Sequence, residues 1–390
     1  MVSDQAPFSL YVHIPYCISK CPYCDFNSHV VSEIPEERHT AALLKEMDFY
    51  AGTGDWCRRG LKSIFFGGGT PSTFSPGSVG KILERAVGLF SFAQDIEITL
   101  EANPGTVESK NFFGYRSCGV NRISIGAQTF RPRLLSFLGR IHSVEESREA
   151  LRVVQRVGFT NFNLDLIYAI PGQSLLDLKA DLEEALSFDP PHLSAYNLTI
   201  EEGTPFFREY RAGRIRPLPE EEEISMAGLI EGTLSRAGLQ RYEISNYAKS
   251  GSHSRHNANY WQGGDYLGIG AGAHSYRRMS GDGIWGQRWH NEKNPGRYME
   301  RIEQEGKAVV GEEESNIQQA AGEFMFLGLR MARGISLAEF SCRFRKTPEE
   351  FYPQIKDWVE VGLMEENRGR LRLTRRGILV SNSVFVHFVE

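Results

Sequence analysis

The stretch FSLYVHIPYCISKCPYCDFNSH, residues 8–29, decides the fold and contains three closely spaced cysteines. Cys17, Cys21 and Cys24 have the spacing C-x3-C-x2-C and come directly after residues 8–14, an apolar run that predicts a buried strand. Cysteine thiolates are the usual ligands of iron–sulfur clusters, and three thiolates on one loop can bind three irons of a cubane. The fourth iron is then open to a small-molecule ligand.

Disulfide and zinc sites explain this loop less well. Three cysteines so close together cannot all pair, and Cys57, Cys118 and Cys342 are scattered singly, which suits a reducing compartment. A zinc site would need a fourth ligand such as His13 or His29, and structural zinc sites usually contain two C-x2-C pairs. We therefore expect a cluster, and we expect the three scattered cysteines to be ordinary buried residues.

Composition limits the classes of partner and location. The 390 residues are 41% hydrophobic and 24% charged, which allows a large core and suggests one large domain and a smaller one. The net charge of -5 gives no electrostatic reason to expect nucleic acid as the main partner. Because no apolar stretch approaches the ~20 residues of a membrane span and the first residues lack a signal pattern, we expect a cytoplasmic protein.

Up to about residue 205, short apolar runs alternate with segments of helical periodicity. The expected strands are 8–14, 61–66, 95–102, 122–128, 161–168 and 192–200. The expected helices are 36–50, 77–90, 107–117, 143–157, 174–187 and 220–237. Six βα units in series predict a parallel sheet with right-handed crossovers, either an open doubly wound sheet or a partial barrel.

Polar residues and glycines follow these strands, at the edge of the sheet where ligands gather in both architectures. GGGTP, residues 67–71, follows the second strand, and its glycines allow a ligand to approach the backbone closely. Glu101 and Asn103 end the third strand, Gln128 ends the fourth, and Asp165 lies in the fifth. We expect these residues to surround one site.

The cluster spacing resembles the radical S-adenosylmethionine superfamily, and HIPYC followed by CPYCDFNSH resembles its HemN and HemW group. This resemblance implies a partial (β/α)6 barrel, a [4Fe-4S] cluster on the three cysteines and S-adenosylmethionine on the open iron. By sequence context alone, Arg140 could equally be a surface arginine at a helix start. The resemblance implies that the residues binding or surrounding S-adenosylmethionine are Tyr11, Tyr23, Gly68, Gly69, Thr70, Glu101, Gln128, Arg140 and Asp165.

A second motif, HNxxYW, lies in the glycine-rich stretch 253–278, which we expect to be a loop-rich surface. Histidine can bind haem iron, and aromatic rings can stack on a porphyrin. A histidine beside two aromatic residues is more often packed than ligating, but the motif resembles the haem-binding signature of the haem-chaperone branch. The resemblance therefore implies haem binding by His256, Asn257, Tyr260 and Trp261, with His256 as the iron ligand. His253 and His274 are weaker candidates, and His274 is implied to face the nucleoside.

The C-terminal residues 311–390 predict a winged-helix-like domain of the HemN type, after a barrel domain at 1–240 and a connecting region at 241–310. The expected helices are 317–332, 336–343 and 348–362, followed by a hairpin-like segment at 362–382. Its arginines could contact DNA phosphates, but acidic residues lie close by, so we favour a structural or docking lid.

The chain departs from the pattern of the oxygen-independent coproporphyrinogen oxidases at two points, and both favour the haem-chaperone branch. The oxidases extend the motif to C-x3-C-x2-C-x-C, where this chain has Phe26, and only ten residues precede Tyr11, which leaves no room for their N-terminal extension. We expect delivery of haem to an acceptor haemoprotein, such as a respiratory protein. The alternatives are coproporphyrinogen III decarboxylation, radical modification of haem, and a DNA-binding regulator. Cleavage of S-adenosylmethionine, and with it enzyme status, stays open, as does a homodimer.

Overall fold

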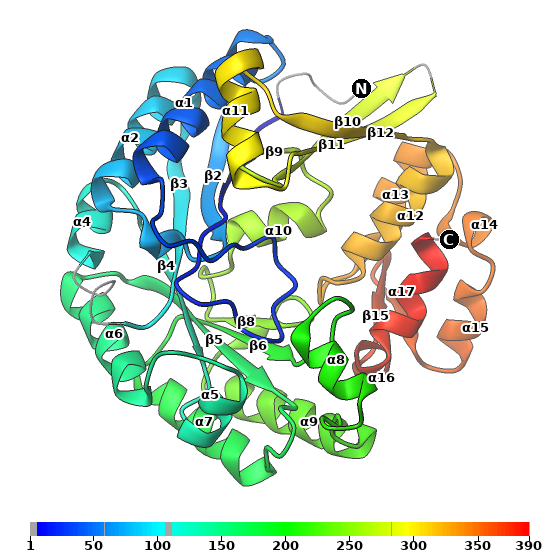
Figure 1. The fold of residues 1–390 in the computed structure, drawn as a ribbon. Helices are drawn as coiled ribbons and strands as arrows, with labels where there is room; N and C mark the ends of the chain where they lie inside the picture. The colour runs from blue at the N-terminus through cyan, green and yellow to red at the C-terminus, as the bar shows by residue number, and fades with distance from the viewer. Residues whose placement is uncertain (1–5, 58, 106–110, 282, 390) are drawn as a thin grey trace.

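The computed structural model describes residues 6–57, 59–105, 111–281 and 283–389 and contains one large sheet beside a small C-terminal domain (Figure 1). The large sheet has the strand order β12-β11-β10-β9-β1-β2-β3-β4-β5-β6-β8-β7. Its central strands run parallel from β1 to β6. They are β1 (Phe8–Ile14), β2 (Gly60–Gly68), β3 (Ser91–Ala102), β4 (Arg122–Gln128), β5 (Asn161–Tyr168) and β6 (His192–Asn197).

Helices form an outer arc around these six strands, so the partial-barrel prediction is confirmed (Figure 1). The arc contains α1 (Glu36–Gly52), α2 (Pro76–Leu89), α4 (Phe112–Ser117), α6 (Val144–Val157), α7 (Leu175–Ser187) and α9 (Glu220–Arg236), with short α5 (Pro132–Phe137), α8 (Pro205–Arg211) and the 3-10 turn η1 (Pro71–Thr73) between them. The predicted helix 107–117 lies partly outside the described residues. The sixth strand ends at Asn197, earlier than predicted, because residues 198–200 leave the ladder.

The main core lies between the sheet and this arc of helices. Phe8, Leu10 and Val12 of β1 are fully buried, and they pack with apolar side chains of the surrounding helices such as Leu43 and Ile82. Removing apolar side chains from water stabilises this arrangement by about 25 cal/mol per Å² of buried area. None of the described helices is long and apolar enough to span a membrane.

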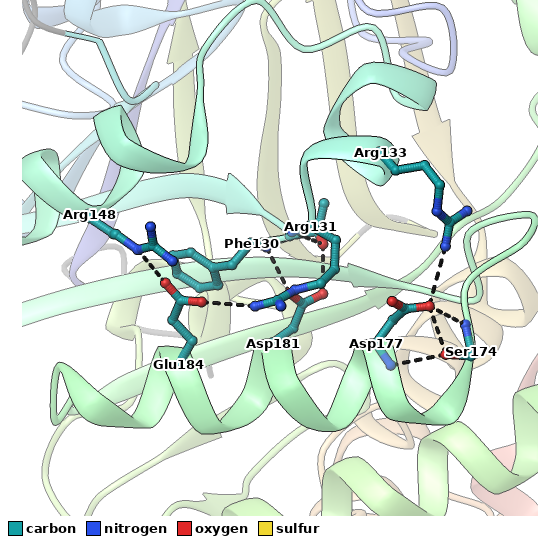
Figure 2. Close-up of polar contacts among 9 residues, drawn as sticks. Phe130, Arg131, Arg133, Arg148, Ser174, Asp177, Asp181 and Glu184 are labelled. Carbon is teal, nitrogen blue, oxygen red and sulfur yellow. Dashed lines mark hydrogen bonds and ion pairs between the residues drawn. The ribbon is translucent and has the colours of Figure 1, made fainter.

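An ion-pair network fastens α7 to the segment that follows β4 (Figure 2). Asp181 of α7 accepts hydrogen bonds from the Thr129 hydroxyl (2.6 Å) and from the Phe130 backbone amide (2.8 Å). Arg131 bridges Asp181 and Glu184 at 3.1 and 2.9 Å. The Asp181 carboxylate is buried and accepts hydrogen bonds from several donors. It therefore holds the carboxyl end of β4, where Gln128 lies, in one position.

The stretch after residue 240 extends the main sheet, so the prediction of a loop-rich surface at 253–278 is wrong. It forms the helix α10 and two strands that continue the sheet beside β1. Periodicity missed these elements because each is short. The elements after α9 are β7 (Gln240–Arg241), β8 (Asn246–Ala248), α10 (Arg255–Trp261), β9 (Tyr266–Ile269), β10 (His274–Gly281), β11 (Ile284–Asn291), α11 (Pro295–Glu305) and β12 (Val309–Ser315).

The C-terminal domain packs its own core, which includes Met325, Phe340 and Phe385. The predicted helix 348–362 is two short helices, because proline at position 353 removes a backbone donor between them. The predicted hairpin is confirmed as β14 and β15, but helices follow it where the prediction had continued the hairpin. The elements are α12 (Ile317–Gly328), β13 (Ile335–Ser336), α13 (Leu337–Phe344), α14 (Pro348–Phe351), α15 (Ile355–Glu360), β14 (Met364–Asn367), β15 (Arg370–Leu373), α16 (Arg375–Leu379) and α17 (Ser381–Val389). The domain boundaries at 240 and 310 stay predictions.

Candidate functional site

A cavity of about 490 Å³ opens inside the partial barrel, between the cysteine loop and strands β2 to β6. Most of the residues expected around S-adenosylmethionine line it. These are Tyr23, Gly68, Gly69, Thr70, Glu101, Gln128, Arg140 and Asp165, together with Cys17, Cys21 and Cys24. Tyr11 is outside this lining, and its hydroxyl lies 3.0 Å from Nδ1 of His13. The carboxyl ends of the strands therefore surround one site, as the sequence predicts.

The cysteine loop is closed at its base by backbone hydrogen bonds. The Cys17 amide donates to the carbonyl of His29 at 3.0 Å, and the His29 amide donates to the carbonyl of Pro15 at 2.7 Å. Lys20 adds bonds from Nζ to the carbonyls of Phe26 and Ser28, at 2.9 and 3.2 Å. All three thiols are free and partly exposed, so the loop presents them toward the cavity rather than burying them in a core.

A chain of side chains joins two of the thiols across the mouth of the cavity. Thr70 Oγ1 donates to Cys17 Sγ at 3.3 Å and accepts from Asn103 Nδ2 at 2.9 Å. Arg140 completes the chain, since one of its amino groups donates to Asn103 Oδ1 and the other lies 3.6 Å from Cys21 Sγ. Arg140 is thus placed at the site and not on the outer surface. Donors aimed at sulfur stabilise thiolates and the clusters that thiolates bind.

The donor set fits a cluster better than a single zinc ion. Both ring nitrogens of His13 are engaged, by the Tyr11 hydroxyl and by the carbonyl of Asn27 at 2.9 Å. His29 Nε2 lies 3.1 Å from Asn27 Oδ1. Within the described ranges, no group of three or more histidine, cysteine or acidic side chains is arranged to hold one metal ion. A cubane places each thiolate on a different iron, so it does not require the three sulfurs to converge on one point.

The glycines of GGGTP are required by the packing of β1 against β2. A Cβ on Gly68, which has φ +114°, would lie 2.6 Å from the ring of His13, and a Cβ on Gly69 would lie 2.6 Å from the carbonyl oxygen of Tyr16. Both glycines also line the cavity. Close approach of the His13 ring and of the Tyr16 backbone therefore explains these glycines without a ligand. The absence of side chains also lets a ligand in the cavity approach their backbone.

Two carboxyl groups face each other inside the cavity. Burial, with a smaller contribution from the charge of Asp165, raises the pKa of Glu101 to about 8. Burial also raises the pKa of Asp165, although Ser194, Asn163 and Ser124 donate toward its carboxylate. At neutral pH Glu101 is therefore mostly protonated and can donate a hydrogen bond to a ligand hydroxyl as well as accept one.

Sequence reasoning missed the polar floor of the cavity. Ordinary barrel interiors are filled by branched apolar residues, but here the inward positions of β4, β5 and β6 are polar. The signal was present as period-2 alternation in RISIGAQ, NFNLDLIY and HLSAYN, where every second residue is polar or glycine for most of the strand. The floor residues are Arg122, Ser124, Asn163, His192, Ser194 and Tyr196.

The HNxxYW motif forms α10, which contacts Ser63 and Phe65 of β2 and Glu97 of β3. His256 is 1% exposed, and its ring stacks on Phe65 with centroids 4.9 Å apart. Its Nδ1 lies 3.0 Å from Ser63 Oγ, and its Nε2 lies 2.9 Å from the Tyr260 hydroxyl. Burial lowers the pKa of His256 to about 3, so the ring is neutral. In this conformation both ring nitrogens are engaged.

The other motif residues face different surroundings. Asn257 lines the cavity, whereas Trp261 packs beside Tyr242 and Met331 with the Arg330 guanidinium 4.5 Å from its ring centre. Both weaker histidine candidates are exposed. His253 stacks on Tyr242 at 4.2 Å and His274 stacks on His290 at 5.1 Å, and neither lines the cavity. The four residues of the motif are therefore not gathered around one pocket.

Comparison with known families and proteins matches the described architecture. Residues 11–185 match the model of the radical SAM superfamily, and residues 318–380 match that of the HemN C-terminal domain. The chain is 37% identical over 387 residues to the haem chaperone HemW of Escherichia coli, covering 98% of each chain. It is 35% identical to HemW of Bacillus subtilis and 38% identical to HemW of Haemophilus influenzae, again over 98% or more of both chains.

The chain belongs to the HemW family of radical SAM proteins. Similarity at this level over the whole length covers the cysteine loop, the barrel and the C-terminal domain together. Among solved structures, the chain is similar to coproporphyrinogen III oxidase (HemN) from Escherichia coli, with a TM-score of 0.82, 21% identity, and coverage of 99% of this chain and 90% of that chain. At this identity the likeness establishes that the two proteins share a fold.

Proposed function

We propose that this member of the HemW family is a haem chaperone, which uses a [4Fe-4S] cluster and S-adenosylmethionine in the barrel cavity and delivers haem unmodified to an acceptor haemoprotein. The observation that carries the proposal is full-length similarity to several proteins named haem chaperone, combined with a three-cysteine loop that opens into a polar cavity. The likeness to a coproporphyrinogen oxidase supports the fold and leaves oxidative decarboxylation as the alternative.

The residues of the chain divide the work in the cavity. When bound, the cluster can supply an electron to the sulfonium of S-adenosylmethionine. Cys17, Cys21 and Cys24 would hold it, with Thr70 and Arg140 donating toward two of the sulfurs. The backbone carbonyl groups of Gly68 and Gly69 would accept hydrogen bonds from the amino group of the ligand. Glu101 and Asp165 would bind its hydroxyl groups. Tyr23 would flank the adenine, and Gln128 would remain a neighbour of the bound ligand.

Haem binding by His256 requires the ring to give up its present contacts, through a change of side-chain conformation or a movement of α10. His256 can bind iron only after Nε2 leaves the Tyr260 hydroxyl and the ring leaves Phe65. Asn257 already reaches the cavity, so motion of α10 would couple the motif to the S-adenosylmethionine site. Tyr260 and Trp261 would then present their rings to the porphyrin.

The remaining assignments are part of the same proposal. The acceptor is a haemoprotein such as a respiratory protein, the working location is the cytoplasm, and a homodimer is one possible assembly. Nucleic acid is not proposed as a partner, because the arginines of β15 are offset by acidic residues of β14, as in the pair between Arg372 and Glu365 at 2.7 Å.

The test is an anaerobic haem-transfer assay. The reconstituted protein is loaded with haem, separated from free haem and mixed with an apo-haemoprotein, and the porphyrin is recovered for mass spectrometry. We expect transfer of haem of unchanged mass. Conversion of coproporphyrinogen III to protoporphyrinogen by the same preparation would contradict the proposal, and so would recovery of methylated or ring-opened haem.

A further inference from the structure

Arg122 is a buried cation without a partner on the floor of the cavity. It begins β4, it is 2% exposed, and its side chain lines the cavity. Among the described residues no hydrogen bond or ion pair of its side chain is found, and its buried Nε has no acceptor. A guanidinium offers five N–H donors in a rigid fork, and leaving such a group unpaired in the interior is costly. A ligand that supplies oxygen acceptors would remove that cost.

The groups around Arg122 do not neutralise it by contact. Burial, with a smaller contribution from the charge of Arg122, lowers the pKa of His192 well below its usual value. His192 is therefore neutral. Glu101 is mostly protonated at neutral pH, since burial raises its pKa to about 8. Asp165 directs its carboxylate toward Asn163 and Ser124, at 2.7 and 3.1 Å, rather than toward the guanidinium. The charge of Arg122 therefore acts on Glu101 and Asp165 through space, but no neighbouring carboxylate in the described part of the chain accepts a hydrogen bond from its guanidinium.

We propose that Arg122 anchors a carboxylate-binding subsite on the floor of the cavity, and that its occupant is a propionate group of the bound tetrapyrrole. The assignment of the occupant rests on the proposed function, whereas the carboxylate chemistry rests on Arg122 itself. Guanidinium groups bind carboxylates through two parallel hydrogen bonds, which gives both affinity and orientation. Tyr196 also lines the cavity and carries a hydroxyl group that can donate to a ligand carboxylate.

A propionate is favoured over the carboxylate of S-adenosylmethionine by position. The cysteines, Gly68 and Thr70 lie at the mouth of the cavity, where the amino-acid end of S-adenosylmethionine is expected. Arg122 begins β4 and Gln128 ends it, so their Cα atoms are about 20 Å apart along the strand. Arg122 lies opposite Thr99 in the ladder between β3 and β4, whereas Glu101 lies opposite Ser124, so a ligand group at Arg122 lies deeper in the barrel than one bound by Glu101.

The decisive experiment compares iron mesoporphyrin, which carries two propionates, with its dimethyl ester, using the reconstituted full chain. The variants are Arg122→Met, which keeps the length of the side chain and removes its charge, and Arg122→Lys. The matched control is Arg152→Met, because Arg152 has a 57% exposed side chain on the outer helix α6. S-adenosylmethionine affinity is measured for every variant.

We expect the wild-type chain and Arg152→Met to bind the diacid at least tenfold more tightly than the diester. Arg122→Met loses this preference, Arg122→Lys recovers part of it, and S-adenosylmethionine affinity stays unchanged. An intact preference in Arg122→Met overturns the proposal. Loss of S-adenosylmethionine affinity with an intact preference also overturns it, because the carboxylate would then belong to that cofactor.

Stability of the ligand-free chain separates a ligand-binding role from a structural one. A guanidinium that holds the fold together lowers the melting temperature when it is removed, whereas an unpaired buried charge leaves it unchanged or raises it when replaced by an apolar side chain. We expect the melting temperature of Arg122→Met to equal or exceed that of the wild type. A lower value, together with unchanged porphyrin affinity, contradicts the subsite.

A small probe distinguishes failure of the subsite from failure of the proposed function. Glutarate, a simple dicarboxylate, is titrated while the melting temperature is followed, since a ligand that binds the native state raises it. We expect a rise in the wild type and in Arg152→Met and none in Arg122→Met. If haem does not bind the wild type but glutarate shows this pattern, the subsite stands and the haem proposal fails. If haem binds and Arg122→Met behaves as wild type in both assays, the haem proposal stands and the subsite fails.

Discussion

The cysteine loop and the HNxxYW helix α10 differ in how completely their polar groups are satisfied. In the loop, Cys17, Cys21 and Cys24 are free, partly exposed thiols at the mouth of a cavity. In α10, His256 is buried and both of its ring nitrogens lie within hydrogen-bond distance of neighbouring side chains. Both motifs carry groups that can bind iron. Only the loop presents them partly exposed at the cavity, whereas the imidazole of α10 is buried and hydrogen-bonded. The comparison teaches that a motif indicates chemistry, whereas the partners of its side chains indicate availability.

The cap of α10 explains why this helix is held in place. Glu97 of β3 accepts hydrogen bonds from the backbone amides of Arg255 and His256, each at 3.0 Å, and it is buried. A carboxylate at this end of a helix satisfies otherwise unpaired amides and opposes the positive end of the helix dipole. The barrel therefore fixes α10 through a charged residue that belongs to the sheet.

The largest expected effect is at the cysteine loop. Cys17→Ala, Cys21→Ala or Cys24→Ala should each abolish the visible charge-transfer absorption of the reconstituted cluster, because two thiolates cannot hold three irons. Absorption spectra and iron content after anaerobic reconstitution check this. Cys342→Ala is the control and should keep the spectrum. Its thiol is exposed, and Cys57 and Cys118 are partly exposed, so the prediction that these three cysteines are buried is wrong. A loop variant that retains full absorbance would show that the substituted cysteine does not bind the cluster.

His256→Ala tests the other side of the comparison. It removes a buried ring together with its hydrogen bonds to Ser63 and Tyr260, so we expect a loss of about 2–4 kcal/mol in the free energy of unfolding. Denaturant unfolding measures this loss. His274→Ala, on an exposed ring, should change stability by less than about 0.5 kcal/mol.

A haem titration of the same variant sharpens the result. We expect weaker haem binding with the cluster spectrum intact, because α10 must supply His256 to the iron. Unchanged haem affinity in a destabilised His256→Ala chain would show that the histidine only packs the barrel.

Glu101→Gln tests the buried charge inside the cavity. A carboxyl group whose pKa is raised from about 4.5 to about 8 by folding contributes less stability as the pH rises between those values, because the folded chain binds the proton more tightly than the unfolded chain. Replacing it with glutamine removes this dependence. The variant should gain on the order of 2 kcal/mol over the wild type at pH 9 relative to pH 5. Thermal unfolding at the two pH values measures the difference, and a difference that stays constant would contradict the raised pKa.

Glu97→Gln should have the smallest effect. The variant keeps one acceptor for the amides at the start of α10 but loses the charge, which should cost about 1 kcal/mol. Asp95→Asn is the matched control, because Asp95 pairs with the exposed side of Arg255 and is itself 72% exposed. Equal losses in the two variants would show that the buried cap has no special role.

The sequence predicts the barrel well because its strands and helices are long and strongly patterned. Residues 8–14 are apolar and buried as expected, and the capping box at Ser143 and Glu146 begins a helix where the pattern places one. The strand-end rule also places Glu101, Gln128 and Asp165 around one cavity, as the structure shows. These features are local, so a single sequence contains the information.

The features that the sequence did not predict depend on contacts between distant segments. α10 is seven residues long, and its place depends on Glu97 and Ser63, which lie more than 150 positions away. The positive φ of 66° at Gln128 arises where the ladder between β4 and β5 is irregular, which no local pattern indicates. Arg122 has the same place in the alternation as other inward residues, but only the structure shows that it has no partner.

The central claim is that three thiolates hold a cluster with one open iron that S-adenosylmethionine fills. The most direct test is metal and sulfide analysis of anaerobically purified protein, followed by electron paramagnetic resonance of the reduced form with and without S-adenosylmethionine. We predict about four irons and four inorganic sulfides per chain, and a signal that changes when S-adenosylmethionine is added. Zinc without sulfide, or a cluster signal that S-adenosylmethionine leaves unchanged, would contradict the claim.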